Sequence, residues 1–269
     1  MTPGSNLAFE SIRDWLVVRC GIHYPDQKRD LLVQRLNRVQ RAFAFSNLEE
    51  LADCLVQRSV NEVELAVISA ASTNHTYFFR EPEILSEFRA SILPKLAERD
   101  EIRIWSAACS TGDEVYTIAM LIAEALGEKA LERTSILGTD ISAPVVERAE
   151  IGVYTERQIA QVPAEMRDRY MKRAGLGQFK ICDTIRERCT FRRMNLKSSP
   201  YPFRNSFQAV FCRNVLYYFD TADQVATLSA VHDVTEAGGW LITSVTESIR
   251  DLPTPWRSVA NGMHRKALP

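Results

Sequence analysis

The stretch from Glu101 to Thr117 reads E-I-R-I-W-S-A-A-C-S-T-G-D-E-V-Y-T and decides the fold class. A short apolar strand, Ile102 to Trp105, leads through small residues to Gly112, and a helical apolar pattern then extends to Leu126. A strand, a small-residue turn and a helix form the first unit of a doubly wound α/β sheet, where ligands bind beyond the carboxyl ends of the strands. Because small side chains let the backbone approach a ligand, we expect this turn to lie at a ligand site.

The turn also restricts which ligand it can hold. A dinucleotide needs the pattern G-x-G-x-x-G, which places backbone amides and a helix N-terminus against the pyrophosphate. Here a single glycine, Gly112, is followed directly by Asp113 and Glu114. Carboxylates repel phosphate and suit a cation such as S-adenosylmethionine (SAM), which carries a sulfonium and an ammonium group. The alternative is that both acids only complement the dipole of the helix that they begin.

Length and composition set the broad class. The chain has 269 residues, which suits one large or two modest domains, and a net charge of −1, which does not favour nucleic acid or an anionic membrane as partner. No apolar run reaches the roughly 18 residues of a membrane span, and the N-terminus lacks a signal-peptide pattern. The six cysteines form no C-x-x-C pair and the four histidines show no metal spacing. We therefore expect a cytoplasmic monomer with reduced thiols, no metal, no nucleic acid and no membrane insertion.

Residues 7 to 70 are predicted to be wholly helical, with one glycine among them. Apolar side chains recur at helical spacing, first at Phe9, Ile12, Trp15 and Leu16, and then over 27–43 at Leu32, Leu36, Val39 and Phe43. A third helix is expected to begin at Ser46, because S-N-L-E has the form of a capping box, and to bury Leu48, Leu51, Leu55 and Val56. A fourth is expected over 60–71.

The second of these helices is strongly basic. Between Gln27 and Arg41 there are five basic residues and one acid, and beside the apolar stripe lie Lys28, Arg35, Arg38 and Arg41. Such a run is usually a solvated helix face. The alternative is a docking surface for an acidic partner, through electrostatic complementarity.

The segment from Ser72 to Glu81 combines hydrogen-bonding residues with three aromatics and an arginine. The aromatics could simply be core at the start of the next helix, which is predicted over 82–96. That interpretation leaves Asn74, Thr76 and Arg80 unexplained, and a junction between two domains is a favoured place for a ligand cleft.

A second strand, Ile136 to Thr139, ends at Asp140, and Ser142 and Pro144 then begin a helix. An acid at this position of a nucleoside-binding α/β fold can accept bonds from both ribose hydroxyls. The other common use of such an aspartate is a helix cap or an Asx-turn. We favour the ribose interpretation.

The alternation of strands and helices is interrupted over residues 150–190. A helix is expected over 165–173, and short strands over 178–185 and 189–194, so that residues 175–194 form a small antiparallel insertion. The alternation resumes with an apolar strand, 207–212, typical of a buried parallel sheet, which ends at Arg213 and Asn214. A helix over 221–234 and a strand over 240–245 follow, and 250–269 are expected to be a loose tail or a linker.

With these pieces in place, the chain resembles the CheR-type chemotaxis-receptor methyltransferase family. Four motifs coincide in order: T-N-H-T-Y-F-F-R-E at 73–81, R-I-W-S-A-A-C-S-T-G-D-E at 103–114, G-T-D-I at 138–141 and F-C-R-N-V-L-Y-Y-F-D at 211–220. The resemblance implies an all-α domain over 1–80 and a Rossmann-like SAM-binding domain over 81–269, with a β-subdomain at 175–194. It implies methyl transfer from SAM to glutamate carboxylates in the cytoplasmic helical region of chemoreceptors.

The resemblance also implies residue roles. It places Arg80 near the transferring methyl and the acceptor carboxylate, and Tyr218 near the incoming glutamate. It assigns contacts with SAM to Asn74, Thr76, Arg80, Glu114, Asp140, Asn195, Leu196, Arg213 and Asn214. The basic helix, with Lys28, Arg35, Arg38 and Arg41, would face the receptor.

The chain departs from the family pattern in two places. The usual Glu-Glu after the glycine is Asp113-Glu114 here, and the usual G-x-S-E near the C-terminus reads S-V-T-E at 244–247. Other readings stay open: a non-catalytic SAM-sensing adaptor, or a methyltransferase of another acceptor. An amino-group methylase of nucleic acid would need prolines after Asn214, where the chain has Val215-Leu216. A dehydrogenase would need the missing glycines.

Overall fold

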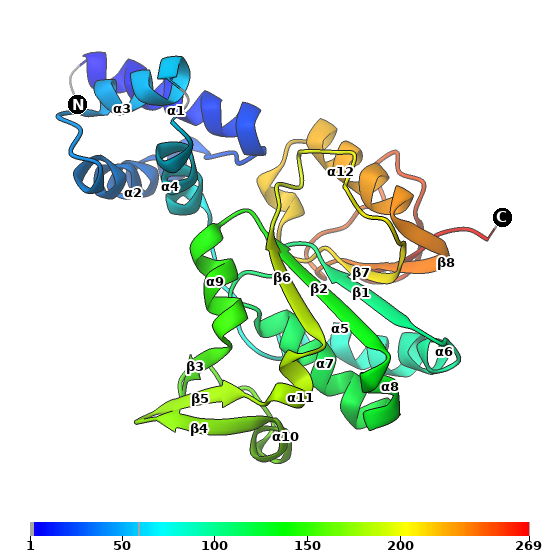
Figure 1. The fold of residues 1–269 in the computed structure, drawn as a ribbon. Helices are drawn as coiled ribbons and strands as arrows, with labels where there is room; N and C mark the ends of the chain where they lie inside the picture. The colour runs from blue at the N-terminus through cyan, green and yellow to red at the C-terminus, as the bar shows by residue number, and fades with distance from the viewer. Residues whose placement is uncertain (1–2, 59, 269) are drawn as a thin grey trace.

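The structure, a computed structural model, describes residues 3–58 and 60–268 and joins a helical part to an α/β part (Figure 1). The helical part packs its helices around one core, in which Phe9, Ile12, Leu16, Leu32 and Leu36 are fully buried. Its helices are α1 (Pro3–Cys20), α2 (Arg29–Ala42), α3 (Leu48–Asp53) and α4 (Asn61–Ala71), with a 3-10 turn at Asp26–Lys28 and a π-helical turn at Cys54–Arg58.

The helical prediction for this part is confirmed, with local corrections. Phe43 and Val56, expected in the core, are 36% and 58% exposed, because α2 ends at Ala42 and the π-helical turn rotates Val56 outward. The capping pattern is shifted by one residue from the expected start. The Oδ1 of Asn47 accepts from the Glu50 amide at 2.8 Å, and a carboxylate oxygen of Glu50 accepts from the Ser46 amide at 2.7 Å.

The α/β part is built on a seven-stranded sheet of order β6-β2-β1-β7-β8-β10-β9. The strands are β1 (Ile102–Ser106), β2 (Thr134–Asp140), β6 (Cys189–Arg193), β7 (Phe207–Phe211), β8 (Thr235–Ile242), β9 (Arg257–Ala260) and β10 (Met263–Arg265). The first five run parallel, and β10 pairs antiparallel with β8 and β9. The doubly wound prediction is thereby confirmed, and the chain reverses direction across the sheet between β1 and β7, which is where such folds bind ligands.

Alternate residues of the central strands face opposite layers, as the two-residue period of a strand requires. Ile104, Phe211 and Ile242 join the larger core, whereas Trp105 and Val210 join a second core on the other face. The helices of this part are α5 (Pro82–Glu87), α6 (Leu93–Ala97), α7 (Asp113–Leu126), α8 (Glu128–Glu132), α9 (Ala143–Ile151), α10 (Ala164–Tyr170), α11 (Asp183–Arg186) and α12 (Thr221–Asp233), with a π-helical turn at Phe88–Ile92 and a 3-10 turn at Leu216–Tyr218. Helices α5 to α7 lie on one side of the sheet and α12 on the other (Figure 1).

A small antiparallel sheet of order β3-β5-β4 stands apart from the main sheet (Figure 1). Its strands are β3 (Val153–Thr155), β4 (Met171–Gly175) and β5 (Gln178–Ile181). The insertion is therefore present, but its expected range of 175–194 needs correction. Cys189–Arg193 pairs in parallel with β2 at the edge of the main sheet, and Met171–Arg173, expected to be helical, begins β4.

The C-terminal stretch is not the expected loose tail. Strands β9 and β10 complete the main sheet, and Trp256, Met263 and His264 are at most 7% exposed. The three-residue length of β10 gave no periodicity that could have shown this pairing in advance. Among residues 3–58 and 60–268, no helix is both long and apolar enough to cross a membrane.

Candidate functional site

One pocket opens where the helical part meets the carboxyl ends of β1, β2, β6 and β7. It encloses about 1020 Å³ of non-protein space, counted to its open mouth. All ten residues that the sequence proposed for cofactor and catalysis line it: Asn74, Thr76, Arg80, Glu114, Asp140, Asn195, Leu196, Arg213, Asn214 and Tyr218. Those residues come from five separate stretches of chain, which the fold brings to one end of the sheet.

The connection between α4 and α5 crosses this pocket. Phe78 is fully buried in the core, and the backbone amide of Phe79 donates to Thr117 Oγ1 at 3.2 Å. Arg80 is about a quarter exposed and its Nη1 donates to the His75 carbonyl at 2.8 Å, so the guanidinium stays at the pocket wall. The predicted helix over 82–96 is confirmed, since α5 begins at Pro82, and 72–81 is a loop.

Asp140 lies at the end of β2 and is 8% exposed. Its two carboxylate oxygens accept from the backbone amides of Ser110 at 2.9 Å and Ser142 at 3.0 Å. Burial raises the pKa of this carboxyl, and the amide bonds oppose that shift. The bond to Ser142 is the Asx-turn contact that the sequence left open, so Asp140 shapes the loop and also presents its carboxylate to the pocket.

The two acids after Gly112 have different surroundings. Glu114 lines the pocket, where its oxygens accept from Ser106 Oγ at 2.8 Å and from Arg213 Nη1 at 2.7 Å. Asp113 is 1% exposed, accepts from Thr111 Oγ1 at 2.6 Å and is not among the described residues that line the pocket. Burial raises the pKa of Asp113 to about 6. The expectation that both acids suit a cation therefore applies to Glu114 alone.

Arg213 is the centre of a buried charge network, with its side chain 3% exposed. Besides Glu114 it contacts Glu81, at 3.3 Å, and donates from Nη2 to the Arg80 carbonyl at 2.7 Å. Its neighbour Asn214 has φ of +59° and donates its backbone amide to Glu247 at 2.6 Å.

Sequence reasoning missed Glu81 and Glu247. Glu81 ends the 73–81 motif between an arginine and a proline, which is a position normally interpreted as a helix start. Glu247 is the one acid of S-V-T-E, in which the family's usual glycine is replaced by Ser244. It accepts from the amides of Asn214, Leu216 and Ser244, so this loop keeps its glutamate in contact with the pocket wall despite the serine at 244.

Apolar side chains also line the pocket. They include Leu196, which is 6% exposed, and Met194, Ile141 and Val215. The side-chain amide of Asn195 donates to the Arg19 carbonyl at 2.8 Å, so it also ties the end of α1 to the sheet.

Tyr218 lies at the pocket with its ring centroid 4.5 Å from that of Tyr217, and the two hydroxyls are 3.5 Å apart. Burial, followed by the bond to Tyr218, raises the pKa of Tyr217. The Tyr217 phenol is therefore a neutral donor at physiological pH.

The four cations of the basic helix are not among the described residues that line the pocket. Lys28, Arg38 and Arg41 are exposed, and among the described residues Lys28 and Arg38 form no ion pair. Arg35 differs, because its Nη1 donates to the Tyr24 hydroxyl at 2.7 Å and to the Ala71 carbonyl at 2.9 Å. It holds the start of the loop that crosses the pocket.

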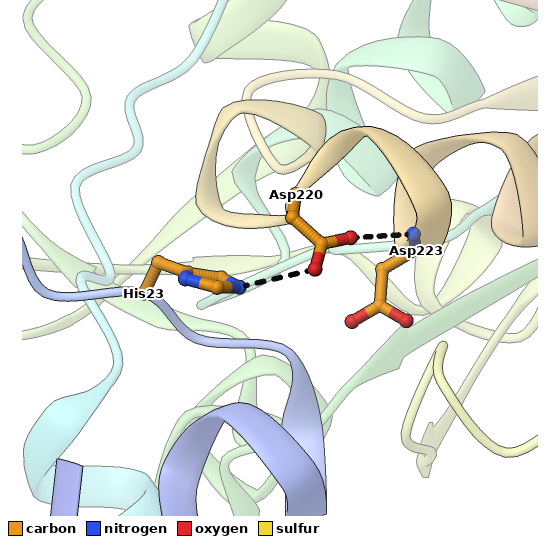
Figure 2. A group of neighbouring side chains, drawn as sticks. All are labelled: His23, Asp220 and Asp223. Atoms are coloured by element: carbon orange, nitrogen blue, oxygen red, sulfur yellow. Dashed lines mark hydrogen bonds and ion pairs between the residues drawn. The ribbon is translucent and has the colours of Figure 1, made fainter. Parts of the chain in front are cut away.

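The histidines that looked scattered in sequence include one with acidic neighbours. Figure 2 shows His23 facing Asp220, with Nε2 and Oδ2 3.7 Å apart, and Asp223 beside them. Their ligand atoms lie within 4.8 Å of one another, which is close enough for a metal ion. Asp220 also caps α12 through the Asp223 amide at 2.7 Å, and Asp223 pairs with Lys197 at 2.5 Å (Figure 2 draws the cap). This group links the helical part to α12.

The donor set of the pocket fits SAM. The buried carboxylate of Asp140 suits ribose hydroxyls, the buried apolar side chain of Leu196 suits a flat ring, and Glu114 offers an anionic oxygen to an ammonium group. No glycine-rich phosphate cradle competes with this assignment, because Gly112, with φ of +88°, is the one glycine of the turn. The fold and the pocket together define a SAM-dependent methyltransferase.

Comparison with known proteins assigns the family. Residues 74–263 match the family model described as "CheR methyltransferase, SAM binding domain", and residues 7–67 match "CheR methyltransferase, all-alpha domain". The chain therefore belongs to the CheR methyltransferase family, and its cofactor is SAM.

Relatives of similar length support the assignment. A chemotaxis protein methyltransferase of Borreliella burgdorferi is 33% identical, covering 86% of this chain and 84% of that protein. One of Vibrio parahaemolyticus is 32% identical over 95% and 94%, and that of Escherichia coli is 31% identical over 92% and 86%. Among solved structures, SAM-bound CalS10 of Micromonospora echinaspora has a TM-score of 0.34 at 14% identity, covering 64% of this chain and 58% of that chain, which is too weak to add to the assignment.

Proposed function

We propose that this protein methylates glutamate side chains in the cytoplasmic helical region of methyl-accepting chemotaxis receptors, and that it does so in the cytoplasm as a monomer. The observation that supports this most directly is that Arg80 and Tyr218 line the same pocket as the proposed SAM residues. The names of the relatives support the chemotaxis pathway.

The proposed reaction requires little proton transfer by the protein. Bound SAM supplies an electrophilic methyl group on its sulfonium. A glutamate with a pKa of about 4.3 is already ionised at pH 7, so its carboxylate needs no general base. The chain must instead align the acceptor oxygen with the methyl group of SAM. Holding reacting atoms in the correct geometry lowers the barrier to the reaction.

Each pocket residue then has a specific role in this proposal. The guanidinium of Arg80 orients the acceptor carboxylate and the Tyr218 hydroxyl donates to its second oxygen. Asp140 holds the ribose, and Glu114 pairs with the ammonium group of the methionine part. Asn195 and Leu196 flank the adenine, and Asn74, Thr76, Arg213 and Asn214 complete the wall.

In the same proposal, the chain divides into a helical domain over 1–80 and a SAM-binding domain over 81–269. The exposed cations Lys28, Arg38 and Arg41 dock an acidic receptor helix. Arg35 contributes to the basic character of this surface, and its bonds to Tyr24 and Ala71 also keep α2 attached to the loop at the pocket.

An Arg80→Ala variant tests the catalytic proposal. We expect methyl transfer to receptor-containing membranes to fall by about 100-fold, because hydrogen bonds to a charged group contribute about 1.5–3 kcal/mol each. SAM binding, measured by calorimetry, should persist. Arg89→Ala, which removes an exposed arginine of the π-helical turn, is the matched control. Unchanged turnover in Arg80→Ala would remove Arg80 from the mechanism, and a wild-type protein that binds SAM without transferring methyl groups would favour an adaptor.

A further inference from the structure

The carboxylate of Glu81 makes several contacts that hold the C-terminal end of the loop that carries Arg80. One oxygen of Glu81 accepts from Ser244 Oγ at 2.7 Å and from Asn214 Nδ2 at 3.2 Å. The other accepts from the Val245 amide at 3.2 Å and lies 3.3 Å from Arg213 Nη2. Glu81 thus joins the loop to the ends of both β7 and β8.

The backbone at this point is unfavourable for a glutamate. Glu81 has φ of +56° and Phe79 has φ of +57°, in the left-handed region that glycine, asparagine and aspartate adopt more readily. Such strained residues persist where surrounding contacts over-determine them, and they cluster at functional sites. Glu81 precedes α5, yet its side chain makes no cap bond to that helix. The side chain is therefore directed to the strand ends, and its length is needed to reach them.

The carboxylate remains charged despite its burial. Its side chain is 15% exposed, and burial by itself would raise the pKa. The bond from Ser244, the charge of Arg213 and the bonds from Asn214 and Val245 outweigh that effect and lower the pKa of Glu81. The anion is therefore present throughout the neutral pH range.

Arg80 depends on this anchor for its place. Its own guanidinium donates to His75 within the same loop, a contact that moves with the loop and does not fix it to the sheet. Its Nε also lies 4.0 Å from Oε1 of Glu81, so the guanidinium is paired directly with the anchoring carboxylate. The link from Arg80 itself to the sheet is its carbonyl, which accepts from Arg213 Nη2 at 2.7 Å. Arg213 is in turn held between Glu81 and Glu114.

We infer that Glu81 is a positioning residue, which fixes the Arg80 guanidinium relative to the acceptor by fastening the 72–81 loop to the ends of β7 and β8. The catalytic part of this inference rests on the proposed function, because Arg80 can orient an acceptor carboxylate only if one enters the pocket. Glu81 acts on the rate of transfer through Arg80. It does not itself touch SAM or the acceptor.

The test is a Glu81→Gln variant, which keeps the size of the side chain and removes its charge. We expect kcat for methyl transfer to fall at least tenfold, while the Kd for SAM stays within threefold. Glu83→Gln is the matched control, since Glu83 is exposed, lies two residues further on and forms no ion pair among the described residues. Ser244→Ala removes one bond to Glu81 and should lower kcat less, in the range of two- to fivefold, so it tests the same anchor if Glu81→Gln folds poorly.

A mutant cycle with Arg80→Lys separates positioning from general destabilisation. If Glu81 acts through Arg80, Glu81→Gln should lower kcat less than threefold in the Arg80→Lys background. Full additivity of the two changes would overturn the inference, and so would an unchanged kcat in Glu81→Gln, or a parallel loss of SAM affinity and kcat.

Hydrogen exchange gives a readout that does not depend on turnover. Amides of residues 73–80 should exchange faster in Glu81→Gln than in the wild type, and at the wild-type rate in Glu83→Gln. If the wild type transferred no methyl group to receptors, the proposed function would be refuted. The exchange measurement would still show whether Glu81 fastens the 72–81 loop. Equal exchange in Glu81→Gln and wild type would contradict it.

Discussion

Replacing Asp140 by alanine tests the cofactor assignment where the structure is most specific. The carboxylate is buried, and each oxygen already accepts one backbone amide, from Ser110 at 2.9 Å and from Ser142 at 3.0 Å. A carboxylate oxygen can accept more than one bond, so each oxygen can also accept from a ribose hydroxyl. Asp140→Ala removes both the proposed ribose contacts and the turn contacts.

The magnitude follows from the number of bonds lost. Two hydrogen bonds to a charged group, at about 1.5–3 kcal/mol each, correspond to about 3–6 kcal/mol of binding free energy. Since about 1.4 kcal/mol is tenfold in affinity, the Kd for SAM should rise by about 100-fold or more. The amides of Ser110 and Ser142 also lose their hydrogen-bond partner in the variant, which lowers stability. Removal of the buried charge of Asp140 offsets part of this loss. We expect a net loss of about 1–3 kcal/mol in the free energy of unfolding.

The assay is calorimetric titration of SAM into folded variant protein at a temperature well below its melting point. Asp100→Ala is the control, because Asp100 is exposed in the loop before β1, at the opposite end of that strand from the pocket. A second titration uses S-adenosylhomocysteine and its 2′,3′-dideoxy form. Wild type should discriminate strongly between them, whereas Asp140→Ala should not. A Kd within threefold of wild type, or undiminished discrimination, would refute the ribose assignment.

Three further perturbations test other parts of the account. Asp113 has a folded pKa of about 6 against an ordinary 3.8, so its own contribution to stability, about 3 kcal/mol, should be lost as the pH rises from about 4 to above 6. The free energy of unfolding of Asp113→Asn should lack this contribution, and equal pH slopes of wild type and variant in urea unfolding would contradict the prediction. Gly138→Ala places a Cβ 2.7 Å from Phe191, so we expect about 1–3 kcal/mol of destabilisation, and an unchanged melting temperature would refute the close packing. The double change Lys28→Glu and Arg38→Glu should raise KM for receptor membranes several-fold at low salt and leave kcat unaltered; a KM that does not move would exclude this surface from docking.

Much of the pocket could be predicted from the sequence because its residues follow strands. Asp140 ends β2 and Arg213 follows β7, and the carboxyl ends of parallel strands must meet at one edge of the sheet. Predicting where each strand ends therefore also predicts that the residues at those ends lie together at this edge of the sheet. The local signal was strong in both places, since a buried parallel strand is an almost unbroken apolar run.

The parts that escaped prediction depend on contacts between distant residues. Strand β10 has only three residues and is defined by its pairing with β8, which no local pattern reveals. Cys189–Arg193 has the composition of a half-exposed strand, and only its partner β2 shows that it belongs to the main sheet. Glu81 binds groups more than 130 residues away, so its role is visible only in the folded chain. Asp113 and Glu114 are adjacent in sequence, yet the first turn of α7 directs only Glu114 to the pocket.

The acceptor in the proposed reaction is a carboxylate, and the chemistry of the methylated product distinguishes it from any other acceptor. The purified protein is incubated with radiolabelled SAM and membranes containing the chemoreceptors of its source, and the labelled receptors are then treated briefly with alkali. A glutamate methyl ester hydrolyses under these conditions, so the account predicts that the label is released as volatile methanol. Label that stays on the protein after alkali would place the methyl group on nitrogen or another acceptor and would contradict the account.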